Sequence, residues 1–234
     1  AIYCEKNLSI YNCKFENNNL TGYLSRKSWG GAICTDKLII AENCSFYRNN
    51  ATPIGVSGTS CAGGAVYVKS GGYIDFISCI FEANECETNG GAIYLDSDDV
   101  HLKVDNCTFN NNIGGEDGGA IYCPGETAVS NSTFTWNQAI KRYEPRSFGG
   151  AIRSKKLITV DNCVFNNNFA INWGGAIYAD KEIRITDSSF YGNSADAAGA
   201  VYASTITQTV SNSEFRNNRD YDDGGALYID DSCS

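Results

Sequence analysis

The chain offers few of the groups that carry out catalysis or hold transition metals. His101 is its only histidine, and none of its 11 cysteines forms a Cys-x-x-Cys pair. Zinc sites are built from histidines and closely spaced cysteines, so no zinc site is expected. No nucleophile pairs with His101 in a way that would make the histidine its base.

Carboxylates are more numerous, and they gather in three acidic clusters: Asp96/Asp98/Asp99, Glu116/Asp117 and Asp220/Asp222/Asp223. Carboxylate oxygens are ligands that Ca²⁺ prefers, but none of these clusters has the spacing of a calcium loop. Solvated turns are the favoured interpretation and Ca²⁺ is the weaker alternative. No other cofactor is indicated.

The most informative feature is a pair of short motifs that recurs eight times. A Phe-x-x-Asn motif is followed each time by Gly-Gly-Ala, with one glycine lost at Ala198, and then by a branched aliphatic residue. The spacing between the motif alanines ranges from 24 residues, Ala176 to Ala200, to 33 residues, Ala32 to Ala65. A fixed motif pair at such a period indicates stacked supersecondary units. The eight phenylalanines are Phe15, Phe46, Phe81, Phe109, Phe134, Phe165, Phe190 and Phe215.

Between the motifs, apolar residues alternate with polar ones, as in Leu102-x-Val104 and Cys107-x-Phe109. Period two is typical of strands with one buried face. Three such strands joined by tight turns make one coil of a parallel β-helix. We therefore predict an all-β solenoid of about eight three-stranded coils, in which the phenylalanines form one interior column. Each buried ring would contribute roughly 2–3 kcal/mol before ordering entropy is subtracted.

A polar residue, usually asparagine, precedes the Cys or Ser of each unit. Asparagine tolerates a left-handed backbone, and its amide can bond the same amide one coil away. These positions are predicted to form a corner ladder, and the asparagine of Phe-x-x-Asn a second one. Representative members of the corner ladder are Asn12, Asn43, Asn106 and Asn162.

Five of the 11 cysteines fall in one inward position that serine fills in other units. Exchange with serine indicates a small slot, so free packed thiols are favoured there over disulfides between coils. The cysteines of this slot are Cys13, Cys44, Cys79, Cys107 and Cys163, and the serines are Ser132, Ser188 and Ser213. Cys61 and Cys86 lie outside it, in the same turn of adjacent units, and are the best candidates for a disulfide. The cysteine content indicates an extracellular location.

The charge and composition of the chain argue against some classes of partner. A net charge of −9 and a pI near 4.6 argue against nucleic acid and anionic membranes. No apolar run is long enough to span a bilayer, so this segment is not expected to insert directly. If the host is eukaryotic, Asn19 and Asn50 begin Asn-x-Thr triplets in long loops that would accept glycans.

Two surfaces are candidate contacts for a partner. Three insertions, near 19–29, 50–62 and 138–148, leave the same turn, and the last carries Lys141, Arg142 and Arg146. A tolerated, solvated insertion is the alternative. The second surface is a tyrosine row that is expected to face water because Arg153 shares its position. It would stack on sugars or pack against a neighbouring copy, whereas mutual stacking that stiffens the sheet is the favoured alternative. The candidate partner residues in this row are Tyr67, Tyr94, Tyr122, Tyr178 and Tyr202.

The alternation of Gly-Gly-Ala-Ile with Phe-x-x-Asn resembles the repeats of the chlamydial polymorphic outer-membrane protein family over essentially residues 1–234. The resemblance implies a right-handed β-helical passenger displayed on a cell surface, often acting in adhesion. Because the chain starts and stops inside a repeat, we expect a single β-helix segment, 1–234, of a longer repeat protein.

Three hypotheses for function follow. The first is a non-catalytic surface adhesin stalk that contacts a protein or glycan on another cell. The second is a filament subunit that packs against neighbouring copies through its tyrosine face. The third is a polysaccharide lyase or hydrolase, which would need clustered carboxylates on a strand face. Asp161, Arg184 and Asp187 come nearest to such a cluster, but Asp187 holds a corner-ladder position, so we expect no enzyme.

Overall fold

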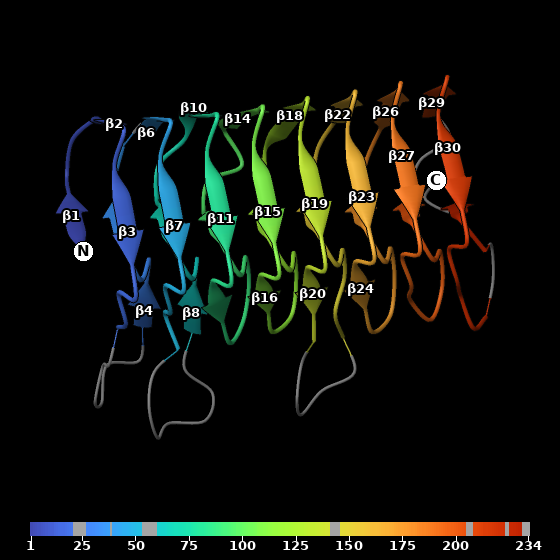
Figure 1. Ribbon diagram of the computed structural model, residues 1–234, viewed down its shortest axis with the longest axis horizontal. Helices are drawn as coiled ribbons and strands as arrows, with labels where there is room; N and C mark the ends of the chain where they lie inside the picture. Colours follow the sequence, from blue (N-terminus) through green and yellow to red (C-terminus); the bar gives the residue numbers. More distant parts are fainter. Residues whose placement is uncertain are drawn as a thin grey trace.

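The computed structural model describes residues 1–20, 27–37, 39–52, 60–140, 146–204, 208–222 and 225–230. All of its regular elements are β-strands, and they stack side by side along one axis in sequence order (Figure 1). Within these ranges no helix is long and apolar enough to cross a bilayer. The predicted all-β parallel solenoid is confirmed.

Three long parallel sheets form the sides of the solenoid. The first sheet begins at the motif alanines and runs in the order β1 (Ile2–Cys4), β5 (Ile33–Thr35), β9 (Val66–Val68), β13 (Ile93–Leu95), β17 (Ile121–Cys123), β21 (Ile152–Ser154), β25 (Ile177–Ala179), β28 (Val201–Ala203) and β31 (Leu227–Ile229). The second sheet consists of β2 (Leu8–Tyr11), β6 (Ile39–Glu42), β10 (Gly72–Ile77), β14 (Val100–Asp105), β18 (Glu126–Ser130), β22 (Ile158–Asp161), β26 (Ile183–Thr186) and β29 (Gln208–Ser211).

The third sheet carries the phenylalanines. It consists of β3 (Lys14–Glu16), β7 (Ser45–Tyr47), β11 (Ile80–Glu82), β15 (Thr108–Asn110), β19 (Thr133–Thr135), β23 (Val164–Asn166), β27 (Ser189–Tyr191) and β30 (Glu214–Arg216). The number of turns is about seven, slightly below the eight predicted.

A fourth short strand follows Phe-x-x-Asn in the middle coils, where three strands per coil were predicted. These strands are β12 (Glu85–Cys86), β16 (Ile113–Gly114), β20 (Gln138–Ala139) and β24 (Phe169–Ala170), which we call the corner sheet. A further pair, β4 (Lys27–Trp29) and β8 (Ser60–Ala62), lies along the same edge (Figure 1). Two-residue strands carry too little alternation for the sequence to reveal them.

The phenylalanine column fills the interior as predicted. In the parallel register Phe81 lies opposite Phe46 and Phe109, and successive ring centroids along the column are 4.6–5.0 Å apart with nearly parallel planes. The six inner rings are completely buried, and the end rings, Phe15 and Phe215, are partly buried. The ring spacing follows from the distance between neighbouring strands.

The asparagines of Phe-x-x-Asn form a continuous buried ladder. The Oδ1 atom of Asn112 accepts from both the backbone N–H and the Nδ2 of Asn84, at 3.0 and 2.9 Å. Its own Nδ2 donates to the oxygen of Phe81 at 3.0 Å and to Oδ1 of Asn137 at 2.9 Å. Every hydrogen-bonding group of this buried amide is therefore satisfied, which removes the cost of burying it.

The corner ladder is looser. Its residues have φ near +50°, as Asn12, Asn43, Asn106 and Asn162 show, and their side chains are exposed. Asn43 Nδ2 donates to Asn12 Oδ1 at 2.6 Å, but Asn106 donates to the hydroxyl of Ser78 instead. A second set of left-handed residues, one before each asparagine of Phe-x-x-Asn, was not predicted, and it includes Arg48 and Trp136.

The two glycines of the motif serve different purposes. Gly118 has φ +63°, a conformation that glycine adopts without strain. Gly119 lies so close to the next coil that a Cβ there would overlap the carbonyl oxygen of Gly150. The first glycine therefore avoids strain in the turn, although Ala198 adopts φ +55° at the equivalent position, and the second is required for the stacking of coils.

The cysteine and serine slot is explained by hydrogen bonding as well as size. The backbone N–H of Cys107 donates to Oγ of Ser132 at 3.0 Å, and that of Cys79 donates to Sγ of Cys107 at 3.3 Å. The γ atom also donates to the carbonyl two residues earlier, as Cys44 Sγ does to Glu42 at 3.2 Å. Thiol and hydroxyl both do this, and the slot cysteines, like the other described cysteines, are unbonded in this structure.

The two ladders predict different costs of mutation. Asn112→Ala removes the acceptor of the backbone N–H of Asn84, one of the two acceptors of the Asn84 Nδ2, and a donor to the carbonyl of Phe81. We therefore expect a loss of roughly 2–5 kcal/mol in the free energy of unfolding. Asn106→Ala, at an exposed position, should cost about 1 kcal/mol, from strain at positive φ. Urea denaturation followed by circular dichroism measures both, and equal losses would contradict the role given to the buried ladder.

Candidate functional site

The outer face of the first sheet carries a column of aromatic side chains. It consists of the residues two positions after each motif alanine: Tyr3, Cys34, Tyr67, Tyr94, Tyr122, Arg153, Tyr178, Tyr202 and Tyr228. We call this the outer column. Within it the rings of Tyr94 and Tyr122 stack with centroids 4.8 Å apart, and those of Tyr178 and Tyr202 with centroids 4.6 Å apart. The mutual stacking that was favoured from the sequence is present.

The prediction that this row faces water is wrong for most of its members. Tyr67 is 2% exposed, Tyr122 and Tyr178 are 7% exposed and Tyr202 is 6% exposed, while Tyr94 is half-buried. Only Tyr3, in the first coil, is 66% exposed. Burial removes most of the ring area that a sugar or a neighbouring copy would contact.

The cover comes from the residue that precedes Gly-Gly. Trp29 stacks on Tyr67 at 4.8 Å, Phe148 packs on Tyr178 at 5.0 Å, and Trp173 stacks on Tyr202 at 5.3 Å. The aromatic residues before Gly-Gly were visible in the sequence, but nothing in a period-two pattern places a turn residue over the outer face of a strand.

Arg153 lies inside the outer column and does not mark a solvated row. It is 7% exposed, and its Nη2 donates to both carboxylate oxygens of Asp180 at 2.8 Å. Its guanidinium lies over the ring of Tyr178, 4.1 Å from the centroid, and its Nε is 3.8 Å from Oδ2 of Asp117. A planar cation can replace a ring in such a stack because it pairs with a carboxylate at its edge and an aromatic at its face.

The position of Asp117 is electrostatically unfavourable for its charged form. Burial raises its pKa to about 6, although Arg153 acts in the opposite direction and Glu116 adds to the rise. Desolvation disfavours the charged form of a carboxyl group, and here it outweighs the cation nearby. The group therefore titrates close to neutral pH.

Tyrosine hydroxyls at the edge of the column donate hydrogen bonds to carboxylates. Asp96 accepts from Tyr67 at 2.8 Å and from Tyr94 at 3.2 Å, and Tyr202 donates to Asp230 at 3.0 Å. Burial, followed by the charge of Asp96, raises the pKa of Tyr94. These hydroxyls are hydrogen-bond donors held in place by the carboxylates.

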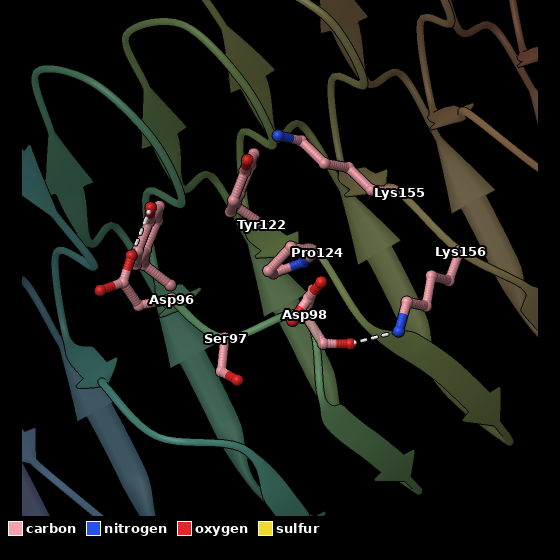
Figure 2. A pocket seen from close by; sticks show the side chains of 8 residues that line it. Asp96, Ser97, Asp98, Tyr122, Pro124, Lys155 and Lys156 are labelled. Carbon is pink, nitrogen blue, oxygen red and sulfur yellow. Dashed lines mark hydrogen bonds between the residues drawn. The ribbon is translucent and has the colours of Figure 1, made fainter.

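Beside the column lies a polar groove of about 580 Å³ (Figure 2). It forms where the two-residue turn between β17 and β18, at Pro124, is flanked by a four-residue turn on one side and a three-residue turn on the other. Asp96 and Asp98 line one wall, and Lys155 and Lys156 line the other. Lys156 Nζ donates to the carbonyl oxygen of Asp98 at 2.6 Å. A groove with both charges on its walls suits a polar ligand such as a saccharide better than an apolar one.

The residues considered for catalysis lie on neighbouring strands, and each has a separate structural role or partner. Arg184 pairs with Glu182 at 2.7 Å, and Asp161 accepts from the hydroxyl of Thr186 at 2.5 Å. Asp187 has φ +48° in the corner ladder. Elsewhere His101 stacks on Tyr73 and lies 3.0 Å from Glu126. Across the described ranges, no three His, Cys, Asp or Glu side chains converge in a way that could hold a metal ion.

The remaining candidate residues are scattered along one edge. Arg146 is exposed, whereas Lys141 and Arg142 lie outside the described residues. Asn19 is exposed and Asn50 is half-buried, and the two form a parallel bridge between coils. Cys61 and Cys86 are free thiols with Sγ atoms 3.0 Å apart.

Comparisons with known proteins agree with this architecture. The family model described as "Right handed beta helix region" matches residues 64–234. A probable autotransporter of Escherichia coli (strain K12), YfaL, is 34% identical over 67% of this chain and 14% of its own length. Probable outer membrane proteins pmp6 and pmp20 of Chlamydia pneumoniae are 30% and 31% identical over 71% and 65% of this chain. The chain spans 15% and 8% of their lengths. No solved structure matches the chain.

The pKa of Asp117 predicts a pH dependence of stability. Because its folded pKa lies above the unfolded value of 3.8, its favourable contribution is complete below about pH 4 and is lost as the pH rises through 6. Asp117→Asn removes this loss, and Asn89 already fills the equivalent position before Gly-Gly in the preceding coil. As the pH rises from 4 to 8, the free energy of unfolding of the variant should increase by about 2–3 kcal/mol relative to that of wild type.

Urea denaturation at pH 4, 6 and 8 measures that difference. Asp98→Asn, at an exposed position, is the matched control and should follow the wild-type profile. A stability difference between Asp117→Asn and wild type that stays constant with pH would contradict the burial argument.

Proposed function

Because this chain belongs to the right-handed β-helix family, and its repeats are of the polymorphic outer-membrane-protein type, we propose that it is a non-catalytic adhesive stalk. Its place is the cell surface, in keeping with relatives named as an autotransporter and outer membrane proteins. The partner in this proposal is a protein or glycan on another cell.

One observation carries the proposal most strongly: the three insertions begin and end at one edge of a continuous solenoid. Their described flanks are Leu20 and Lys27, Thr52 and Ser60, and Ile140 and Arg146. Strands β4, β8 and β20, which adjoin these flanks, lie along the same edge in Figure 1. Insertions that share an edge would present a common surface while the ladders behind them keep their register.

The chemistry of the surface supports binding over catalysis. Charged side chains of the second sheet are paired locally, as Arg184 is with Glu182, and the groove at Pro124 holds carboxylates and ammonium groups on opposite walls. A glycosidase would instead need two carboxyl groups that flank the scissile bond, whereas Asp96 and Asp98 line the same wall of the groove. The filament hypothesis loses support because most outer-column tyrosines are already covered by the chain itself.

Charge reversal of the basic insertion tests the adhesive role. Beads coated with the chain should bind host-cell monolayers or glycan arrays, and Lys141→Glu/Arg142→Glu/Arg146→Glu should reduce bound beads at least about tenfold, as expected for the loss of several charge contacts. A second variant, Lys155→Glu/Lys156→Glu, tests whether the groove at Pro124 also contacts the partner.

The matched control is Lys37→Glu/Lys181→Glu, which changes exposed lysines away from both surfaces and should bind as wild type does. Unchanged melting temperatures would show that the variants are folded. If wild-type beads bind no better than albumin-coated beads across the cell and glycan panels, the adhesive function is wrong.

A further inference from the structure

Two buried thiols meet at the edge from which the insertions leave. Cys61 lies in β8 and Cys86 in β12, in adjacent coils, and both residues are 1% exposed. Their Sγ atoms are 3.0 Å apart, with Cys86 donating to Cys61. A disulfide needs a sulfur separation of about 2.05 Å, so closing the bond requires a shift of about 1 Å.

This pair differs from the cysteines of the interior slot. In the slot each γ atom is held by backbone groups, as Cys107 Sγ is by the carbonyls of Phe76 and Asp105, both at 3.3 Å. Serine replaces cysteine there without disturbing the pattern, so sulfur itself is not required.

Only the Cys86 position lacks such a pattern in the other coils, whereas Cys61 Sγ accepts from the backbone N–H of Glu87 at 3.1 Å. The register places Cys86 in line with Gly114, Ala139 and Ala170, which carry no γ heteroatom. Cys61 lies opposite Ser28 on one side, and on the other its sulfur is 3.8 Å from the hydroxyl of Thr88. The sulfur of Cys86 therefore occurs where the aligned residues carry no γ heteroatom, and it lies in contact with a second sulfur.

We propose that Cys61 and Cys86 form a disulfide that ties two coils together at the base of the insertion 53–59. The proposal rests on the cell-surface location, because thiols persist in reducing compartments and oxidise in export pathways. Both cysteines belong to this chain, so the proposed bond is intramolecular.

The chemistry balances with an external disulfide, such as glutathione disulfide or an oxidised dithiol enzyme, as the oxidant. One thiolate attacks a sulfur of the oxidant and releases one reduced thiol, and the second protein thiol loses its proton and displaces the other. Two protein thiols become one disulfide while one external disulfide becomes two thiols.

Because both sulfurs are buried, the exchange takes place as the two coils close during folding. The finished bond would then be shielded from reductants in the folded protein. Its effect on stability should be local, because coils of a solenoid contact only their neighbours.

Peptide mapping tests the bond directly. The chain is exported to the bacterial periplasm, alkylated under denaturing, non-reducing conditions and digested with trypsin and a glutamate-specific protease. We expect residues 49–69 linked to 86–87 or 83–87, because Arg48, Lys69, Glu82, Glu85 and Glu87 are the cleavage sites. Reduction should release both peptides.

Cys79 and Cys107 are the internal control, since they are neighbours in adjacent coils and should be recovered alkylated. In Cys61→Ala, Cys86 should be alkylated, and the converse should hold for Cys86→Ala. Recovery of alkylated Cys61 and Cys86 from exported wild type, or their linkage to other cysteines, would overturn the proposal. The readout does not use cell binding, so it is independent of the adhesive function.

Discussion

The structure depends on one constraint: in a parallel stack, each side chain lies one strand spacing, about 4.8 Å, from its equivalent in the next coil. A side chain that stacks on, or hydrogen-bonds to, an identical side chain can therefore occupy the same position in every coil. Phenylalanine rings stack on one another, and the asparagine amide both donates to and accepts from an identical amide. The two most regular motifs of the sequence are the two side chains that meet this condition best.

The same constraint governs the exposed charges, because like charges would repel at this distance. Along the second sheet the register reads Asp75, Lys103, Ala128, Thr159 and Arg184, so no charge faces its like. Asp105 and Asp161 are separated by Ser130, whose hydroxyl donates to Asp105 at 2.8 Å. Arg153 is accommodated for the same reason, since its neighbours in the outer column are tyrosines.

Features that repeat in register could be predicted from the sequence, and features that depend on a turn could not. The phenylalanine column, both asparagine ladders and the cysteine and serine slot follow from comparing one unit with the next. The burial of Tyr178 depends on Phe148 and Trp173, which reach it from the turns before Gly-Gly, and no strand pattern encodes that contact. Arg153 was misassigned because charge alone suggested solvent, whereas its exposure is set by the partners Asp180 and Tyr178. For function, the sequence located the insertions and the thiol pair, but the groove beside Pro124 depends on unequal turn lengths in three successive coils.

The central claim is that all the units stack into one continuous solenoid, and a distance between remote coils tests it most directly. Spin labels carried by noncanonical amino acids at Ile80 and Glu214 would occupy exposed positions in one register row of the third sheet, five strand spacings apart. Pulsed electron paramagnetic resonance should give a narrow distribution centred, apart from the label linkers, at about 24 Å. A broad distribution extending well beyond about 40 Å, as expected for an extended chain of separately folded units, would contradict the account.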